Sequence, residues 1–152
     1  MNGYTVRAIA TPGHTRDSMT YFIPELKCLI SGEAIAVMDR RHSVRPQFLS
    51  SYKEYINSLQ KLASLDLDLI LMGHDYALTG PDAAGYIERV IKATVGFKDR
   101  IESALSDTGG KNEAVVKRIF EEDYVGNPAI QQDEPSFLIN LGAMVKAVAE
   151  GK

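Results

Sequence analysis

The chain has 152 residues, of which 45% are hydrophobic and 24% charged, with a net charge of −3 and one cysteine. This length predicts a single folded unit with its own core. The negative net charge argues against a protein that binds nucleic acid by neutralising its phosphates. A single cysteine excludes an internal disulfide and favours a reducing, cytoplasmic location. No apolar run reaches the roughly 18 residues that span a bilayer, so no membrane partner is expected, and the first residues lack the basic-then-apolar form of a signal peptide.

The first third of the chain is rich in strand-forming residues. Residues 4–10, 19–23 and 28–31 predict three strands. A long loop at residues 11–18 joins the first two strands, and a short connection joins the second to the third, so we predict an antiparallel meander. Cys28 falls within the third strand, where we interpret it as a buried small residue rather than a nucleophile.

The middle of the chain predicts a loop, a helix and a buried strand. Residues 36–49 lack periodicity and are interpreted as a surface loop. Ser51 and Glu54 then form the capping pattern of a helix start. The apolar face of that helix comprises Tyr52, Tyr55, Ile56, Leu59 and Leu62. The continuous apolar run at residues 68–72 follows, as is typical of a buried strand.

The second half of the chain is predicted to be helical. A turn at residues 80–82 opens a long helix, and Gly109 and Gly110 end it. Asn112 is the predicted cap of the next helix, and Pro135 suits the first turn of the last one. The three predicted helices cover residues 83–106, 113–124 and 136–150.

Three short segments place ionisable side chains just past predicted strand ends. They read "TPGHT" at residues 11–15, "SGEA" at 31–34 and "MGHD" at 72–75, and they carry His14, Glu33 and His74. Strand ends present side chains from a rigid support. Imidazole and carboxylate groups are the usual ligands of zinc, iron or manganese, so these three residues are candidate metal ligands.

The three segments occur in an order that resembles the metallo-β-lactamase superfamily, over roughly residues 4–105. A helix and a buried strand separate the second segment from the third, as in that family. The resemblance implies that His14 and His74 bind metal, with Glu33 as the carboxylate that bridges two metals. It implies zinc, with iron or manganese as alternatives. The implied activity is metal-assisted hydrolysis of a small-molecule ester, thioester, amide or phosphodiester.

Two departures from the family pattern shape the expected fold. Glu33 stands where the family has aspartate, and the family's His-x-His-x-Asp-His motif is absent, since His14 is the first histidine. We therefore expect an α/β (α+β) fold consisting of the C-terminal half of an αββα sandwich. Residues 1–107 would form this half domain, with residues 108–152 as a helical extension packed on it. Half a sandwich exposes an apolar sheet face, which predicts a homodimer or association with a missing N-terminal half.

Several alternatives stay open at this point. The chain could be a hydrolase, or a C-terminal fragment of one that is incomplete as a catalyst by itself. It could instead be a non-catalytic, dimerising module whose metal residues are relics, or an α/β domain with structural histidines and no bound metal. Arg41, His42 and Arg45 form either a patch that binds a substrate anion or a solvated loop. Asp75 is either a hydrogen-bond partner of the site or a turn residue.

Overall fold

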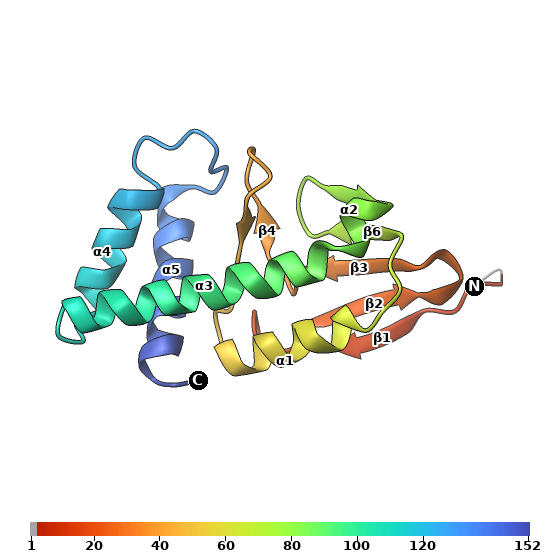
Figure 1. The fold of residues 1–152 in the computed structure, drawn as a ribbon, viewed down its shortest axis with the longest axis horizontal. Coiled ribbons are helices and arrows are strands. Elements are labelled where there is room, and N and C mark those ends of the chain that lie inside the picture. The colour runs from red at the N-terminus through yellow and green to blue at the C-terminus, as the bar shows by residue number, and fades with distance from the viewer. Residues whose placement is uncertain (1–2) are drawn as a thin grey trace.

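A computed structural model describes residues 3–152 of the chain. Its main sheet has five strands in the order β1-β2-β3-β6-β7 (Figure 1). The first three strands pair antiparallel, as the predicted meander requires, whereas β6 runs parallel to β3 and β7 antiparallel to β6. The strands are β1 (Arg7–Ala10), β2 (Met19–Ile23), β3 (Cys28–Gly32), β6 (Leu69–Met72) and β7 (Ala77–Thr79).

Helices cover one face of this sheet and extend beyond it. Figure 1 shows α1 and the long α3 side by side across the sheet, with α4 and α5 at the far end of α3. The Ser51 side chain accepts a hydrogen bond from the Glu54 amide at 3.2 Å, so the predicted helix cap is present. Within residues 3–152, no helix is both long and apolar enough to cross a bilayer. The helices are η1 (Pro24–Leu26), α1 (Tyr52–Ala63), α2 (Pro81–Ala84), α3 (Tyr86–Asp107), α4 (Asn112–Asp123) and α5 (Glu134–Ala149).

The two faces of the sheet differ sharply in exposure. Neighbouring residues of a strand point to opposite faces, and the strand register aligns them into rows. The inner row of Phe22, Leu29 and Ile70 is buried beneath the helices. The outer row consists of Tyr21, Ile30 and Leu71, which are 44%, 39% and 38% exposed. Among residues 3–152 this outer row stays partly open to solvent, in contrast to the inner row.

Residues 36–49 correct the prediction of an irregular loop. They contain a small antiparallel hairpin of β4 (Val37–Met38) and β5 (Val44–Arg45). Each strand has only two residues, too few for an alternating pattern to stand out. Asp39 shapes the turn, because its side chain accepts hydrogen bonds from the amides of Arg41 and Ser43 at 2.8 and 2.9 Å.

Other element boundaries also differ from the sequence prediction. The first strand begins at Arg7 rather than residue 4, and the three-residue β7 was not predicted. The helix expected from residue 83 is split at Gly85 into α2 and α3. Asn112 is the first residue of α4 rather than its cap, and the N-cap, Lys111, makes no side-chain capping bond.

The C-terminal helices share the core of the rest of the chain. Leu59 of α1, Ile101 of α3, Ile119 of α4 and Leu141 of α5 belong to one set of contacting, buried apolar residues. The helical extension therefore packs on the preceding residues through a continuous core. The division into two domains between residues 107 and 108 stays a prediction.

Candidate metal-binding site

The loop that carries His14 is anchored to the start of α1. Gly13 has a φ of +134°, and a Cβ at this position would lie 2.4 Å from the Tyr55 Cα, so only glycine fits there. The Gly13 carbonyl accepts hydrogen bonds from the amides of Ser50 and Ser51 at 3.0 and 3.2 Å. The Ser58 hydroxyl donates to the carbonyl of Pro12 at 2.8 Å. These contacts fix the position from which His14 projects.

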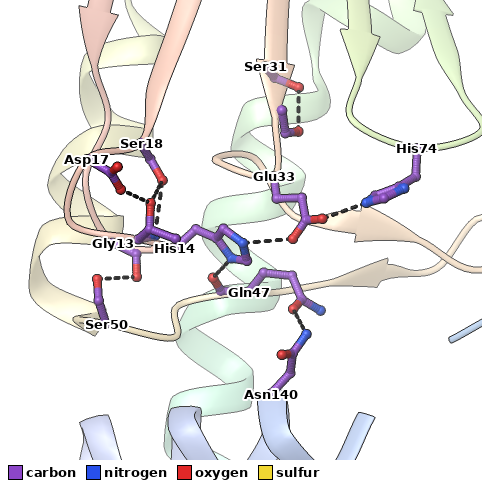
Figure 2. Close-up of polar contacts among 12 residues, drawn as sticks. Gly13, His14, Asp17, Ser18, Ser31, Glu33, Gln47, Ser50, His74 and Asn140 are labelled. Carbon is purple, nitrogen blue, oxygen red and sulfur yellow. Dashed lines mark hydrogen bonds and ion pairs between the residues drawn. The ribbon is translucent and has the colours of Figure 1, made fainter. Parts of the chain in front are cut away.

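The imidazole of His14 is held at both nitrogens (Figure 2). Nδ1 lies 2.9 Å from the main-chain carbonyl oxygen of Gln47, and Nε2 lies 2.8 Å from Oε2 of Glu33. Because a carbonyl oxygen only accepts hydrogen bonds, Nδ1 carries a proton. The contact with Gln47 therefore directs Nε2 toward Glu33.

Glu33 and His74 meet because the ends of β3 and β6 are adjacent. The two parallel strands pair Gly32 with Met72 at the last step of their register. His74 then places Nε2 2.5 Å from Oε1 of Glu33. His14 and His74 thus bind the two oxygens of one carboxylate, so the three residues that the sequence singled out converge in space (Figure 2).

These contacts shift the ionisation of the carboxylate and of one imidazole. The hydrogen bond from His14, opposed by burial and reinforced by the hydrogen bond from His74, lowers the pKa of Glu33 to about 2. Burial works to lower the pKa of His14, but the hydrogen bond to Glu33 and the bond to the Gln47 carbonyl outweigh it, so this pKa is raised. The cluster therefore favours an ionised Glu33 facing a protonated His14.

The donor chemistry of the cluster fits part of a metal site. Metal-binding histidines commonly donate their second ring N–H to a carbonyl or carboxylate, and His14 does so toward Gln47. Within residues 3–152, however, no three His, Cys, Asp or Glu side chains are arranged as a group that could hold a metal ion. Glu33 contacts both imidazoles directly. The three side chains therefore form at most a partial ligand set, and their role as ligands stays a prediction.

A pocket of about 450 Å³ opens beside Glu33 and His74. The small hairpin of β4 and β5 forms one of its walls, and the segment at residues 130–140 forms another. Gln131 joins the two sides by donating from Nε2 to Oδ2 of Asp75 at 3.0 Å. Asp75 has a φ of +52° and this amide partner. It thus combines a turn conformation with a side-chain hydrogen bond at the pocket, so both interpretations of Asp75 stay open.

The three candidate residues for anion binding lie in different places. Arg45 lines the pocket, and its guanidinium lies 4.9 Å from the ring centroid of Phe137. Burial lowers the pKa of Arg45. Arg41 is exposed on the turn of the hairpin, and His42 packs edge-on against Tyr76 with ring centroids 5.4 Å apart. Only Arg45 of the three borders the pocket.

Two amide side chains that the sequence analysis did not single out form part of the pocket wall. Gln47 is 4% exposed, and its Oε1 accepts a hydrogen bond from Asn140 Nδ2 at 3.1 Å. Both residues line the pocket. Neither lies in a recognisable motif, and the pair is separated by 93 positions, so no local pattern could have connected them.

Comparisons with known proteins agree on one family. Residues 4–74 match the model of the family described as "Metallo-beta-lactamase superfamily". A hydroxyacylglutathione hydrolase of Bartonella quintana is 32% identical over 148 residues, which cover 97% of this chain and 55% of that protein. The enzyme of the same name from Acidiphilium cryptum is 35% identical over 114 residues, or 71% of this chain and 44% of that one. The chain thus spans about half the length of these relatives.

Solved structures give the same view of the fold. A metallo-beta-lactamase family protein from Thermus thermophilus matches with a TM-score of 0.62 and 19% identity, over 98% of this chain and 46% of that one. A beta-lactamase domain protein from Burkholderia ambifaria matches with a TM-score of 0.63 and 19% identity, over 96% and 41%. The arrangement of sheet and helices therefore corresponds to part of a larger fold.

Proposed function

The chain belongs to the metallo-beta-lactamase superfamily, and we propose that it forms one half of a metal-dependent hydrolase. The observation that carries the proposal is the meeting of His14 and His74 on the carboxylate of Glu33. These three residues would hold zinc, with iron or manganese as alternatives, and further ligands would come from a segment equivalent to the remainder of the relatives. When bound, such a metal lowers the pKa of water and polarises a carbonyl group.

The residues of this chain would prepare the site in separate ways. Gln47 holds a proton of His14 on Nδ1, so Nε2 is the nitrogen that would give up its proton to a metal and act as the ligand. The low pKa of Glu33 keeps its carboxylate ionised, as a metal ligand must be. The adjacent pocket gives a small substrate access to the cluster. The relatives named hydroxyacylglutathione hydrolases support a small thioester or ester as the substrate.

Zinc binding to the purified chain tests this proposal. We expect zinc to bind to the chain in a titration followed by calorimetry, and we expect His14→Ala or His74→Ala to weaken binding by at least about tenfold. His42→Ala is the matched control, because His42 packs on Tyr76 away from the cluster. Equal zinc affinity in all four proteins would contradict the assignment of ligands.

Activity would require the complementary half. The chain alone should hydrolyse thioesters no faster than its His14→Ala variant. Co-expression with the N-terminal half of the Bartonella quintana relative should produce thioesterase activity that depends on His14 and His74. A fully active isolated chain would show that the site needs no further ligands.

A second candidate function rests on the outer face of the sheet. Tyr21, Ile30 and Leu71 form an exposed apolar row, and surfaces of this kind favour association. In this alternative the chain is a non-catalytic module, in the cytoplasm, that dimerises through this face. Light scattering coupled to size-exclusion chromatography should then give twice the chain mass, and the dimer should form equally well in His14→Ala.

A further inference from the structure

Gln47 lies at the junction of the His14 contact and the pocket. Its main-chain oxygen binds His14, while its side-chain Oε1 is held by Asn140 of α5. With Oε1 fixed in this way, the amide nitrogen points away from His14 (Figure 2). Among the described residues, none accepts a hydrogen bond from Gln47 Nε2. Gln47 is 4% exposed and lines the pocket, so its Nε2 is a donor that a ligand in the pocket could use.

The charges around the pocket indicate which ligand such a donor would meet. Glu33, Asp39, Asp75 and Asp133 border the space, against Arg45 as its one permanently charged cation among the described residues. A negatively charged ligand would be repelled by this excess of carboxylates. A neutral ligand with a carbonyl oxygen suits both the donor and the charge.

We propose that Gln47 is a specificity-determining residue that donates a hydrogen bond from Nε2 to the carbonyl oxygen of a neutral, acyl-bearing ligand. Asn140 is the positioning residue, because its Nδ2 binds Oε1 of Gln47 and so sets which end of the amide faces the pocket. The proposal rests on the hydrolase function in one respect, because the pocket is taken as the substrate site on the ground that it borders Glu33 and His74. Binding of the ligand itself needs no metal.

Two substitutions of nearly unchanged shape test the direction of the amide. In N140D the new carboxylate only accepts hydrogen bonds, so the Gln47 amide must turn over and present its oxygen to the pocket. In Q47E an acceptor for Asn140 is retained, as is the main-chain oxygen that holds His14, but the donor is lost. Both variants should therefore bind a carbonyl ligand less well while His14 stays in place.

The probe is methyl lactate, a neutral ester, with lactate as its charged counterpart, in the presence of a chelator. In the wild-type chain, methyl lactate should shift the side-chain NH₂ resonances of Gln47 in a ¹H–¹⁵N spectrum to a saturating limit, and lactate should bind at least about tenfold more weakly. Because Q47E lacks this NH₂ group, binding to the variants is followed through the main-chain amide resonances of residues that line the pocket; N140D and Q47E should each weaken binding of methyl lactate about fivefold, the usual contribution of one hydrogen bond. N112D adds the same charge at an exposed position and should leave binding unchanged.

The outcomes separate this proposal from the function of the site. If methyl lactate leaves the Gln47 resonances unmoved, or if N140D and Q47E both keep the wild-type affinity, the proposal is wrong. Zinc affinity is measured separately, on the chain without probe. If the wild-type chain binds methyl lactate but no zinc, the metal assignment alone is wrong. If it binds zinc but not methyl lactate, the role of Gln47 alone is wrong.

Discussion

Gly73 lies so close to Gly32 that a side chain between them is excluded. The Gly73 amide donates to the Gly32 carbonyl at 3.2 Å, and a Cβ on Gly73 would lie 2.9 Å from the Gly32 carbonyl carbon. Glu33 and His74 are the next residues in the chain, just past the ends of β3 and β6. The close approach of the two glycines therefore brings the carboxylate and the imidazole within contact.

Gly73→Ala should push these strand ends apart. The added methyl group meets main-chain atoms that cannot rotate away, so we expect the free energy of unfolding to fall by about 1–3 kcal/mol in urea denaturation. Gly142→Ala is the matched control, because no atom lies near its Cβ position within α5. The free energy of unfolding of this control should rise by about 0.5–1 kcal/mol, because alanine is favoured over glycine inside a helix. A Gly73→Ala protein as stable as wild type would contradict the described approach.

Gly13→Ala should be more damaging. The alanine would have an unfavourable φ, and its methyl group would collide with the main chain of Tyr55. We therefore expect the free energy of unfolding to fall by more than about 3 kcal/mol in urea denaturation. Gly96→Ala in α3 has open space around it and serves as the control. If both variants unfold at the same urea concentration, the loop that carries His14 is not packed on α1.

The stability of the metal-free chain should depend on pH through Glu33 and His14. Glu33 has its pKa lowered from 4.5 to about 2, so its contribution is present above pH 4.5 and is lost as the pH falls toward 2. His14 has its pKa raised from 6.5, so its contribution is present below pH 6.5 and is lost as the pH rises through the raised value. The contribution of this pair is therefore fully present between pH 4.5 and 6.5.

Urea midpoints at about pH 3, 5.5 and 8 measure this effect. The wild-type chain should show a larger midpoint near 5.5 than at either extreme. Glu33→Gln removes the charge but keeps the shape, so its midpoints should vary less over the same range. Identical profiles for the two proteins would place the pH dependence elsewhere in the chain.

Two neighbouring residues of β3 should respond in opposite ways. Leu29 is fully buried, and Leu29→Ala should lower the free energy of unfolding by about 2–5 kcal/mol. Ile30 is 39% exposed on the other face, so Ile30→Lys should change the stability of the monomer far less. If the outer face mediates a dimer, Ile30→Lys should instead shift the mass in light scattering to that of a monomer. A dimer unaffected by this change would use another surface.

Much of the site could be predicted because its residues lie in short segments with strong signals. Pro12 and Gly13 mark a tight loop beside His14, and the apolar run before Gly73 identifies a strand end. The contacts of His14 and His74 with Glu33 show that these segments meet. The role of the three side chains as metal ligands stays a prediction, because these local segments specify where the side chains lie and not what they bind.

The pocket could not be predicted in the same way. Its wall includes β4 and β5, whose two-residue strands carry no periodicity. The bond between Gln47 and Asn140 depends on how α5 packs, which is a tertiary property. Arg41, His42 and Arg45 are close in sequence, but the turn of the hairpin separates them, and only Arg45 reaches the pocket.

The contact between Asn140 and Gln47 also bears on the order in which the chain acquires its parts during synthesis. The strands β1, β2 and β3 pair with near neighbours and can form while the rest is still being made. Asn140, the partner of Gln47, is made only after all five strands of the main sheet and helices α1 to α4. Until α5 is made, the nascent chain has its sheet and helices α1 to α4 but lacks the Asn140 side of the cleft, so a small molecule has no completed cleft to bind in.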